Sequence, residues 1–170
     1  FSEDSQLQTI GKYAFSNTSI ESIRIPSQVT FIGYQAFGSC HKLSKIEFSH
    51  NSKLQNIDDY AFIGSSIKRI SIPSQVTRIG KYSFSECVEL TYIKVPNDSN
   101  LQIIEKCAFA ESSIECITIP SKLTELKEGW CERVFNLSKI YVSPNNPFYI
   151  WLDEKFLLKK SSIEKNNYDS

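Results

Sequence analysis

Apolar residues recur along the chain in two short patterns that alternate. In the first, a Leu or Val is followed by Ile and then by a small residue and Phe, as in Leu54, Ile57 and Phe62. The second places apolar residues at alternate positions, as in Ile46 and Phe48, which predicts a short strand with one buried face. We expect such strands within residues 20–25, 43–48, 67–72, 90–95, 114–119 and 137–142.

The expected strands start 23, 24, 23, 24 and 23 residues apart, so units of two lengths alternate with a double period of 47 residues. Residues 7–28 and 54–75 are identical at 13 of 22 positions, and residues 101–122 repeat them again. One short strand per unit of this length is the template of leucine-rich repeats. The chain is therefore predicted to be a leucine-rich-repeat solenoid of the α/β class. Short parallel strands would form its concave face, with short helical or 3₁₀ turns and loops on the convex face.

The Phe of the first pattern should stack as a ladder inside the solenoid, because each unit can bury its apolar side only against its neighbours. The last unit breaks this regularity, since Cys131 takes the Phe position and Trp130 takes that of the small residue. The ladder would consist of Phe15, Phe37, Phe62, Phe84 and Phe109. Glycines four residues ahead of three of them are expected at tight bends: Gly11, Gly33 and Gly80.

The repeats suggest two parts in the chain. Residues 1–147 would form the array of about six units, and residues 148–170 a non-repeat flank with a strand pair around residues 153–155 and then a polar linker. The opening FSEDSQLQTI matches FSHNSKLQNI at residues 48–57, and the chain contains no Met. We therefore expect the N-terminal unit to be truncated, as in an internal fragment of a longer array.

The motif Phe-x-x-Cys-x-x-Leu-x-x-Ile-x-Val-Pro, from Phe84 to Pro96, resembles that of the BspA-like leucine-rich repeats. This family is known from anaerobic bacteria and parasitic protists, and the likeness recurs in phase over most of residues 1–147. The resemblance implies a cell-surface or secreted protein that adheres to host components or matrix proteins. It implies no catalytic activity and supplies no binding residue to transfer.

Composition indicates little chemistry. Lys+Arg and Asp+Glu number 19 each, so bulk charge does not favour nucleic acid as a partner, and no apolar run is long enough to enter a membrane as a helix. His41 and His50 occupy variable positions without a catalytic or metal-ligand spacing, so we expect no enzyme activity, no cofactor and no metal.

Two classes of modifiable residue remain. Cys40 and Cys87 occupy equivalent positions and should be buried thiols, too far apart for a disulfide, whereas Cys116 is expected at the surface. Three sequons permit N-glycosylation but argue for it only weakly: Asn17, Asn97 and Asn136.

Strand alternation predicts the functional surface. If Ile46 and Phe48 point inward, Lys45 and Glu47 point outward, and the same rule applies in every unit. Two outward rows on the concave face then hold five basic residues and one acid, although the chain is neutral. The alternative is a solvated face with fortuitous charge. The candidate ligand-binding residues are Arg24, Lys45, Arg69, Tyr92, Lys94, Lys139 and Tyr141.

Two functions remain open at this point. The first is a non-enzymatic adhesion module, a fragment of a surface protein that binds a host protein, matrix component or glycan, with an acidic ligand favoured by the basic rows. The second is a structural spacer that projects another domain and has no ligand of its own.

Overall fold

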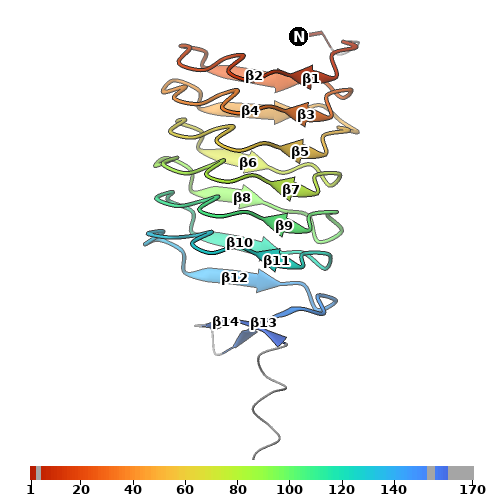
Figure 1. The fold of residues 1–170 in the computed structure, drawn as a ribbon, viewed down its shortest axis with the longest axis vertical. Coiled ribbons are helices and arrows are strands. Elements are labelled where there is room, and N and C mark those ends of the chain that lie inside the picture. The colour runs from red at the N-terminus through yellow and green to blue at the C-terminus, as the bar shows by residue number, and fades with distance from the viewer. Residues whose placement is uncertain (3–4, 153–155, 161–170) are drawn as a thin grey trace, which may run out of the picture.

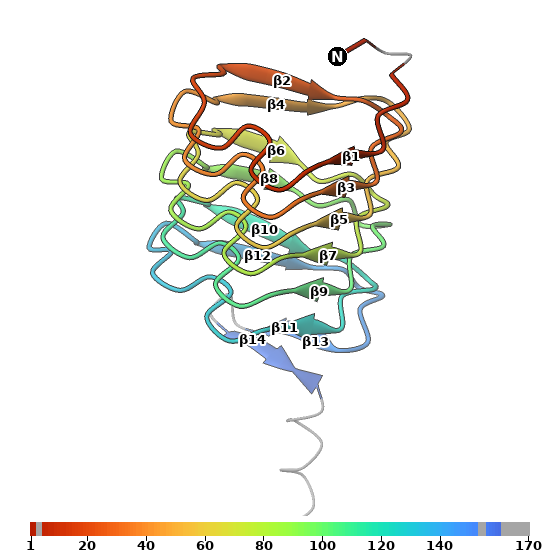
Figure 2. The same cartoon turned by 45° about the horizontal axis from the view of Figure 1, so that its top comes forward.

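The computed structural model describes residues 1–2, 5–152 and 156–160. The chain winds into a stack of coils, each of which contributes one strand to each of two parallel six-stranded sheets (Figures 1 and 2). By residue numbers the coils are coil 1 (7–28), coil 2 (29–53), coil 3 (54–75), coil 4 (76–100), coil 5 (101–122) and coil 6 (123–147). Within each sheet, strands are neighbours in chain order, as a solenoid requires.

The sheets differ in strand length. The long-strand sheet consists of β2 (Ser22–Ile25), β4 (Lys45–Phe48), β6 (Arg69–Ser71), β8 (Tyr92–Lys94), β10 (Cys116–Ile119) and β12 (Lys139–Val142). The short-strand sheet consists of β1 (Thr9–Ile10), β3 (Phe31–Ile32), β5 (Asn56–Ile57), β7 (Arg78–Ile79), β9 (Ile103–Ile104) and β11 (Glu125–Leu126). The parallel strands of a leucine-rich-repeat solenoid are confirmed, and the first apolar pattern forms a second sheet that the sequence did not indicate.

The turns of the array are not helices, which corrects the expected helical or 3₁₀ turns of the convex face. In coil 3 the amides of Tyr60 and Phe62 donate to the carbonyls of Lys81 and Ser83 in the next coil, both at 2.8 Å. The amide between them, that of Ala61, bonds inside the coil, to the Asp58 carbonyl at 3.3 Å. A helix would need every amide for its own turn, so this alternation excludes one. Positive φ angles also interrupt the segment, at Tyr60 (61°) and at Gly64 (62°).

The Phe ladder is confirmed. Phe37, Phe62, Phe84 and Phe109 are completely buried, and Phe15 in coil 1 is half-buried. Successive rings stack with centroids 5.1–5.4 Å apart and planes within 10° of parallel. Offset-stacked rings at this distance add to the free energy gained from burial. The ladder therefore links coils 1 to 5 through one continuous apolar contact.

Two buried thiols lie beside the ladder. The Cys40 Sγ donates to the Phe15 carbonyl at 3.0 Å, and the Cys87 Sγ to the Phe62 carbonyl at 3.1 Å. Burial raises the pKa of Cys87 to about 11, so this thiol stays protonated at neutral pH. Cys40 and Cys87 thus act as small core residues that also satisfy a turn carbonyl, and both are free thiols.

The chain leaves coil 6 through a buried asparagine. The Asn146 side-chain amide donates to the carbonyls of Pro120 (2.7 Å) and Leu123 (3.1 Å) in coil 5 and at the start of coil 6. Its Oδ1 accepts the amides of Phe148 and Tyr149, each at 2.8 Å, at the start of an antiparallel hairpin. That hairpin pairs β13 (Tyr149–Leu152) with β14 (Phe156–Lys159). The expected turn at 153–155 and linker at 161–170 lie outside the described residues, and the division of the chain at residue 147 stays a prediction.

Gly80 begins the expected tight bend and also allows close packing of coils. Its carbonyl accepts the Ser83 amide at 3.3 Å, which closes the turn. Its φ is not positive, but a Cβ there would lie 2.5 Å from the Asp58 carbonyl carbon in the preceding coil. Gly80 donates its amide to the Ile57 carbonyl at 2.9 Å, which holds the two backbones together. At Gly11, the equivalent position of coil 1, a Cβ would meet nothing within 4 Å. A side chain at this repeat position would therefore fit in coil 1 but would collide with the preceding backbone in coil 4.

We predict that Phe62→Ala lowers the free energy of unfolding by about 3–5 kcal/mol, because it removes a completely buried ring between two stacked neighbours. Chemical denaturation measures the loss. Val88→Ala, at a side chain that is 66% exposed, is the control and should change stability by less than about 0.5 kcal/mol. A loss below about 1 kcal/mol for Phe62→Ala would show that the ladder does not hold the core.

A second prediction compares two glycines in one repeat position. Gly80→Ala should destabilise the chain by about 1–3 kcal/mol, because the preceding backbone must shift away from the new methyl group. Gly11→Ala should leave stability unchanged or raise it by up to about 1 kcal/mol, since space is open and the unfolded chain loses entropy. Equal thermal unfolding curves for the two variants would disprove close approach of the coils at Gly80.

Candidate functional site

Strand register places the first predicted row on the exposed side of the long-strand sheet. Lys45 in β4 has Arg69 in β6 as its Cα partner, and Arg69 in turn pairs with Tyr92 in β8. All three are exposed, whereas Ile46, Ile70 and Ile93, which follow them, are buried. The complete row is Ser22, Lys45, Arg69, Tyr92, Cys116 and Lys139, each the register partner of the next. That these residues bind a ligand stays a prediction.

The second row carries an ion-pair cluster that strand alternation alone did not reveal. Glu47 accepts from the Lys45 Nζ at 2.7 Å and from the Arg24 Nη2 at 3.0 Å. The hydrogen bond from Lys45, followed by that from Arg24, lowers the pKa of Glu47. All three groups are well solvated, so the cluster adds little to stability. It fixes Lys45 and Arg24 around one carboxylate and compensates part of their charge.

The exposed tyrosines of this face are partly covered by its cations. The Arg69 guanidinium lies 5.0 Å from the Tyr92 ring centroid, and the Lys139 ammonium lies 5.0 Å from that of Tyr141. Cation–π contacts of this geometry hold a charged side chain in place at an exposed site. The rings therefore position the cations. Each ring has less free surface to offer a partner than the sequence alone indicated.

A basic groove of about 690 Å³ lies where β4 and β6 meet the exposed side of this sheet. We use the name basic groove for the depression whose lining includes the side chains of Arg24, Lys45, Glu47, Lys68, Arg69 and Tyr92, together with residues 48–50 and Ser71. Lys68 was missed from the sequence, because it precedes β6 and its direction cannot be read from strand alternation. Four basic side chains and one carboxylate thus share the groove, although the chain as a whole has no net charge.

A second depression, the notch, has a volume of about 850 Å³ and lies over the end of β6. Coils 2 and 4 have 25 residues and coil 3 has 22, and the additional length of coils 2 and 4 lies largely in the loops after their long strands. The notch is lined by Ser49–Lys53 of coil 2, Ser71–Gln75 of coil 3, and Lys94, Pro96 and Asp98 of coil 4, beside Thr30, Phe48 and Gln55. The alternating unit lengths in the sequence were a signal for the notch. Its lining could not be predicted from them, because it combines residues of three neighbouring coils.

A third cavity, of about 740 Å³, lies between coil 6 and the β13–β14 hairpin. Both tryptophans of the chain, Trp130 and Trp151, line it together with Cys131. Cys131 replaces the ladder Phe, and its smaller side chain leaves part of the core unfilled at this end. Burial raises the pKa of the Cys131 thiol to about 11.

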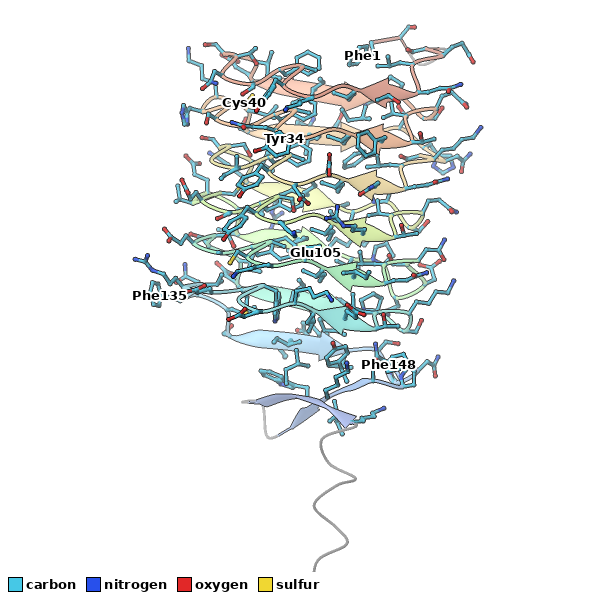
Figure 3. All side chains as sticks on the ribbon, in the orientation of Figure 1. Phe1, Tyr34, Cys40, Glu105, Phe135 and Phe148 are labelled. Atoms are coloured by element: carbon cyan, nitrogen blue, oxygen red, sulfur yellow. The ribbon has the colours of Figure 1, made fainter. Side chains whose placement is uncertain are left out.

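The sequon asparagines Asn17, Asn97 and Asn136 are all exposed in turns or loops. Asn17 has a φ of 58°, and Asn136 follows Phe135, which is 88% exposed and projects from the coil 6 turn (Figure 3). Their use for glycosylation stays a prediction.

His41 and His50 are exposed, and His50 lines both the groove and the notch. Among the described residues, no group of His, Cys, Asp and Glu is arranged to hold a metal ion. Over the same residues, no helix has the length and apolar character needed to cross a bilayer.

Solved structures share this architecture. The chain is 26% identical to the pneumococcal vaccine antigen PcpA, with a TM-score of 0.85, over 91% of this chain and 40% of that one. It is 25% identical to a leucine-rich cell surface protein from Faecalibacterium prausnitzii, with a TM-score of 0.63, over 87% and 45% of the two chains. The fold alone is shared with a leucine-rich repeat protein of T. pallidum, at 24% identity, a TM-score of 0.71, and coverage of 96% and 78%. No curated protein matches the sequence.

The stacked coils, parallel sheets and Phe ladder define a leucine-rich-repeat solenoid. The family model described as BspA type leucine-rich repeat region matches residues 5–147 in six copies. The chain belongs to this family. It spans only about 40–45% of the length of the first two solved structures named above.

Proposed function

We propose that the chain is a non-enzymatic adhesion module of a cell-surface protein, and that the basic groove binds an acidic ligand on a host protein, matrix component or glycan. A surface location is supported by the family and by the surface protein and vaccine antigen among the similar structures. Repeat solenoids offer extended faces whose exposed residues vary without loss of the fold, which suits them to binding.

One observation carries the proposal. Lys45 and Arg69 are direct register partners on neighbouring strands, and like charges at such positions destabilise a sheet. Glu47 compensates Lys45 and Arg24, but among the described residues no ion pair to Arg69, Lys94 or Lys139 is present. A fold-destabilising arrangement at an exposed site is typical of a surface that serves binding.

The spacer remains the second function, because a solenoid of this kind projects a neighbouring domain whatever its surface carries. It predicts that replacing the exposed residues of the groove changes no binding at all. The adhesion proposal predicts a specific loss.

The adhesion proposal is tested by the double variant Lys45→Glu, Arg69→Glu, measured by surface plasmon resonance against a panel of purified extracellular matrix glycoproteins. The wild-type chain should bind at least one of them. The double variant should associate about tenfold more slowly and with a weaker dependence on salt, because electrostatic steering acts on the association rate.

The matched control is Lys81→Glu, Lys106→Glu, which makes the same change in net charge at two exposed lysines outside the groove and the notch. It should bind like the wild type. Equal binding by the groove variant and the wild type, or no binding to any member of the panel, would contradict the proposal and favour the spacer.

A further inference from the structure

We infer that the groove and the notch form one continuous site for an anionic glycan chain, a polysaccharide whose sugars carry sulfate or carboxylate groups. This inference rests on the proposed function and narrows its ligand to one chemical class. It concerns coils 2 to 4 and Arg24 of coil 1.

The two depressions adjoin each other. Phe48, Ser49, His50 and Ser71 line both of them, so a ligand that fills the groove meets the notch at these four residues. Their volumes, about 690 and 850 Å³, are each comparable to a small-molecule site, so the two together have room for more than one small ligand. Two adjoining depressions of this size suit a segment of a polymer that places successive units in each.

Among the three 22-residue coils, only coil 3 is basic at the start of its long strand. At the place where coil 3 has Lys68 and Arg69, coil 1 has Glu21 and Ser22, and coil 5 has Glu115 and Cys116. The fold therefore accepts an acidic and a small residue here, and the Lys–Arg pair of coil 3 is not required for folding. Because Arg69 is also held over the Tyr92 ring, its guanidinium is positioned for an anionic oxygen.

The notch adds groups that suit sugar hydroxyls. Its walls carry the hydroxyl and amide side chains of Ser52, Asn51, Ser74 and Gln75, with Lys94 at one side. Two of these groups already make hydrogen bonds: the Gln75 Oε1 accepts from the Asn100 amide at 3.2 Å, and the Ser52 Oγ accepts from the Leu54 amide at 3.4 Å. Hydroxyl and amide groups donate and accept, as the hydroxyls of a sugar do.

The composition favours a glycan over an acidic protein. The centres of protein–protein interfaces are depleted of Lys and Ser and depend on a few anchors, most often Trp, Tyr and Arg. Here Lys and Ser supply nine of the 25 lining residues, and the exposed aromatic ring, that of Tyr92, has one face covered by Arg69. A hydrated, highly charged chain matches such a surface better than an apolar side chain does.

The test uses isothermal titration calorimetry with three probes: a heparin-derived oligosaccharide, its desulfated form, which keeps the carboxylates, and a poly-glutamate peptide of the same total charge as the first. We expect the sulfated oligosaccharide to bind most tightly, the desulfated form more weakly, and poly-glutamate about tenfold or more below the sulfated form. Affinity for the sulfated form should fall as salt is raised.

Two variants locate the site. Lys68→Glu with Arg69→Ser gives coil 3 the residues that coil 1 already carries, so it should fold normally and reduce affinity for the sulfated oligosaccharide about tenfold or more. Ser71→Tyr adds no charge and blocks the junction between groove and notch. Coil 6 has Tyr141 at this position, so the variant should fold, but it should also weaken binding several-fold. Lys81→Glu with Lys106→Ser changes the net charge as the first variant does and should bind like the wild type.

Each outcome of these titrations supports or overturns the inference. Loss of binding in both site variants, with the control unaffected, supports the inference. Equal affinity for poly-glutamate and the sulfated oligosaccharide overturns the glycan and leaves the proposed acidic-ligand function standing. If Ser71→Tyr binds the sulfated oligosaccharide as tightly as the wild type does, the groove and the notch do not form one site. No binding of any probe overturns the inference, whereas the adhesion proposal is decided separately by the matrix-protein panel.

Discussion

The structure depends on backbone hydrogen bonding between coils, which continues through the turns as well as through the sheets. The amides of Phe37, Phe62 and Phe84 donate to the carbonyls of Ala61, Ser83 and Ala108 in the following coils at 2.7–2.8 Å. Buried amides without a partner are costly, so a turn whose amides point to the next coil is satisfied only when that coil is in place. The same residues stack their rings, and the polar and apolar contacts between coils therefore form together.

This arrangement leaves the exposed side of the long-strand sheet free to vary. The inward residues Ile46, Ile70 and Ile93 are fixed by the core, whereas the outward positions between them tolerate Lys, Arg, Tyr, Ser or Cys in different coils. Alternation of 22- and 25-residue coils then shapes this side, because longer loops flank a shorter one. A surface with its own relief and charge thus arises without altering the backbone contacts that hold the coils together.

The sequence predicted the features that depend on local alternation. Ile46 and Phe48 alternate with charged residues, so β4 and the direction of Lys45 could be read directly. β5 could not, because a strand of two residues, Asn56–Ile57, has no alternation to recognise. The turns were read as helical since nothing in the sequence marks a left-handed conformation at Tyr60 or Tyr82, which have positive φ without being Gly.

The candidate site was predictable only in part, for a related reason. The outward rows follow from register, but Lys68 lies before its strand, and the clustering of Lys45 and Arg24 around Glu47 depends on side-chain conformation. The notch combines loops from coils 2, 3 and 4 and has no counterpart in any single unit.

Backbone amide hydrogen exchange tests most directly whether hydrogen bonds between coils hold the turns. The turn amides of Phe37, Phe62 and Phe84 should exchange as slowly as the long-strand amides of their own coils, because both are released only when coils separate. Turn amides that exchange far faster than the strands beside them would contradict this role of the hydrogen bonds.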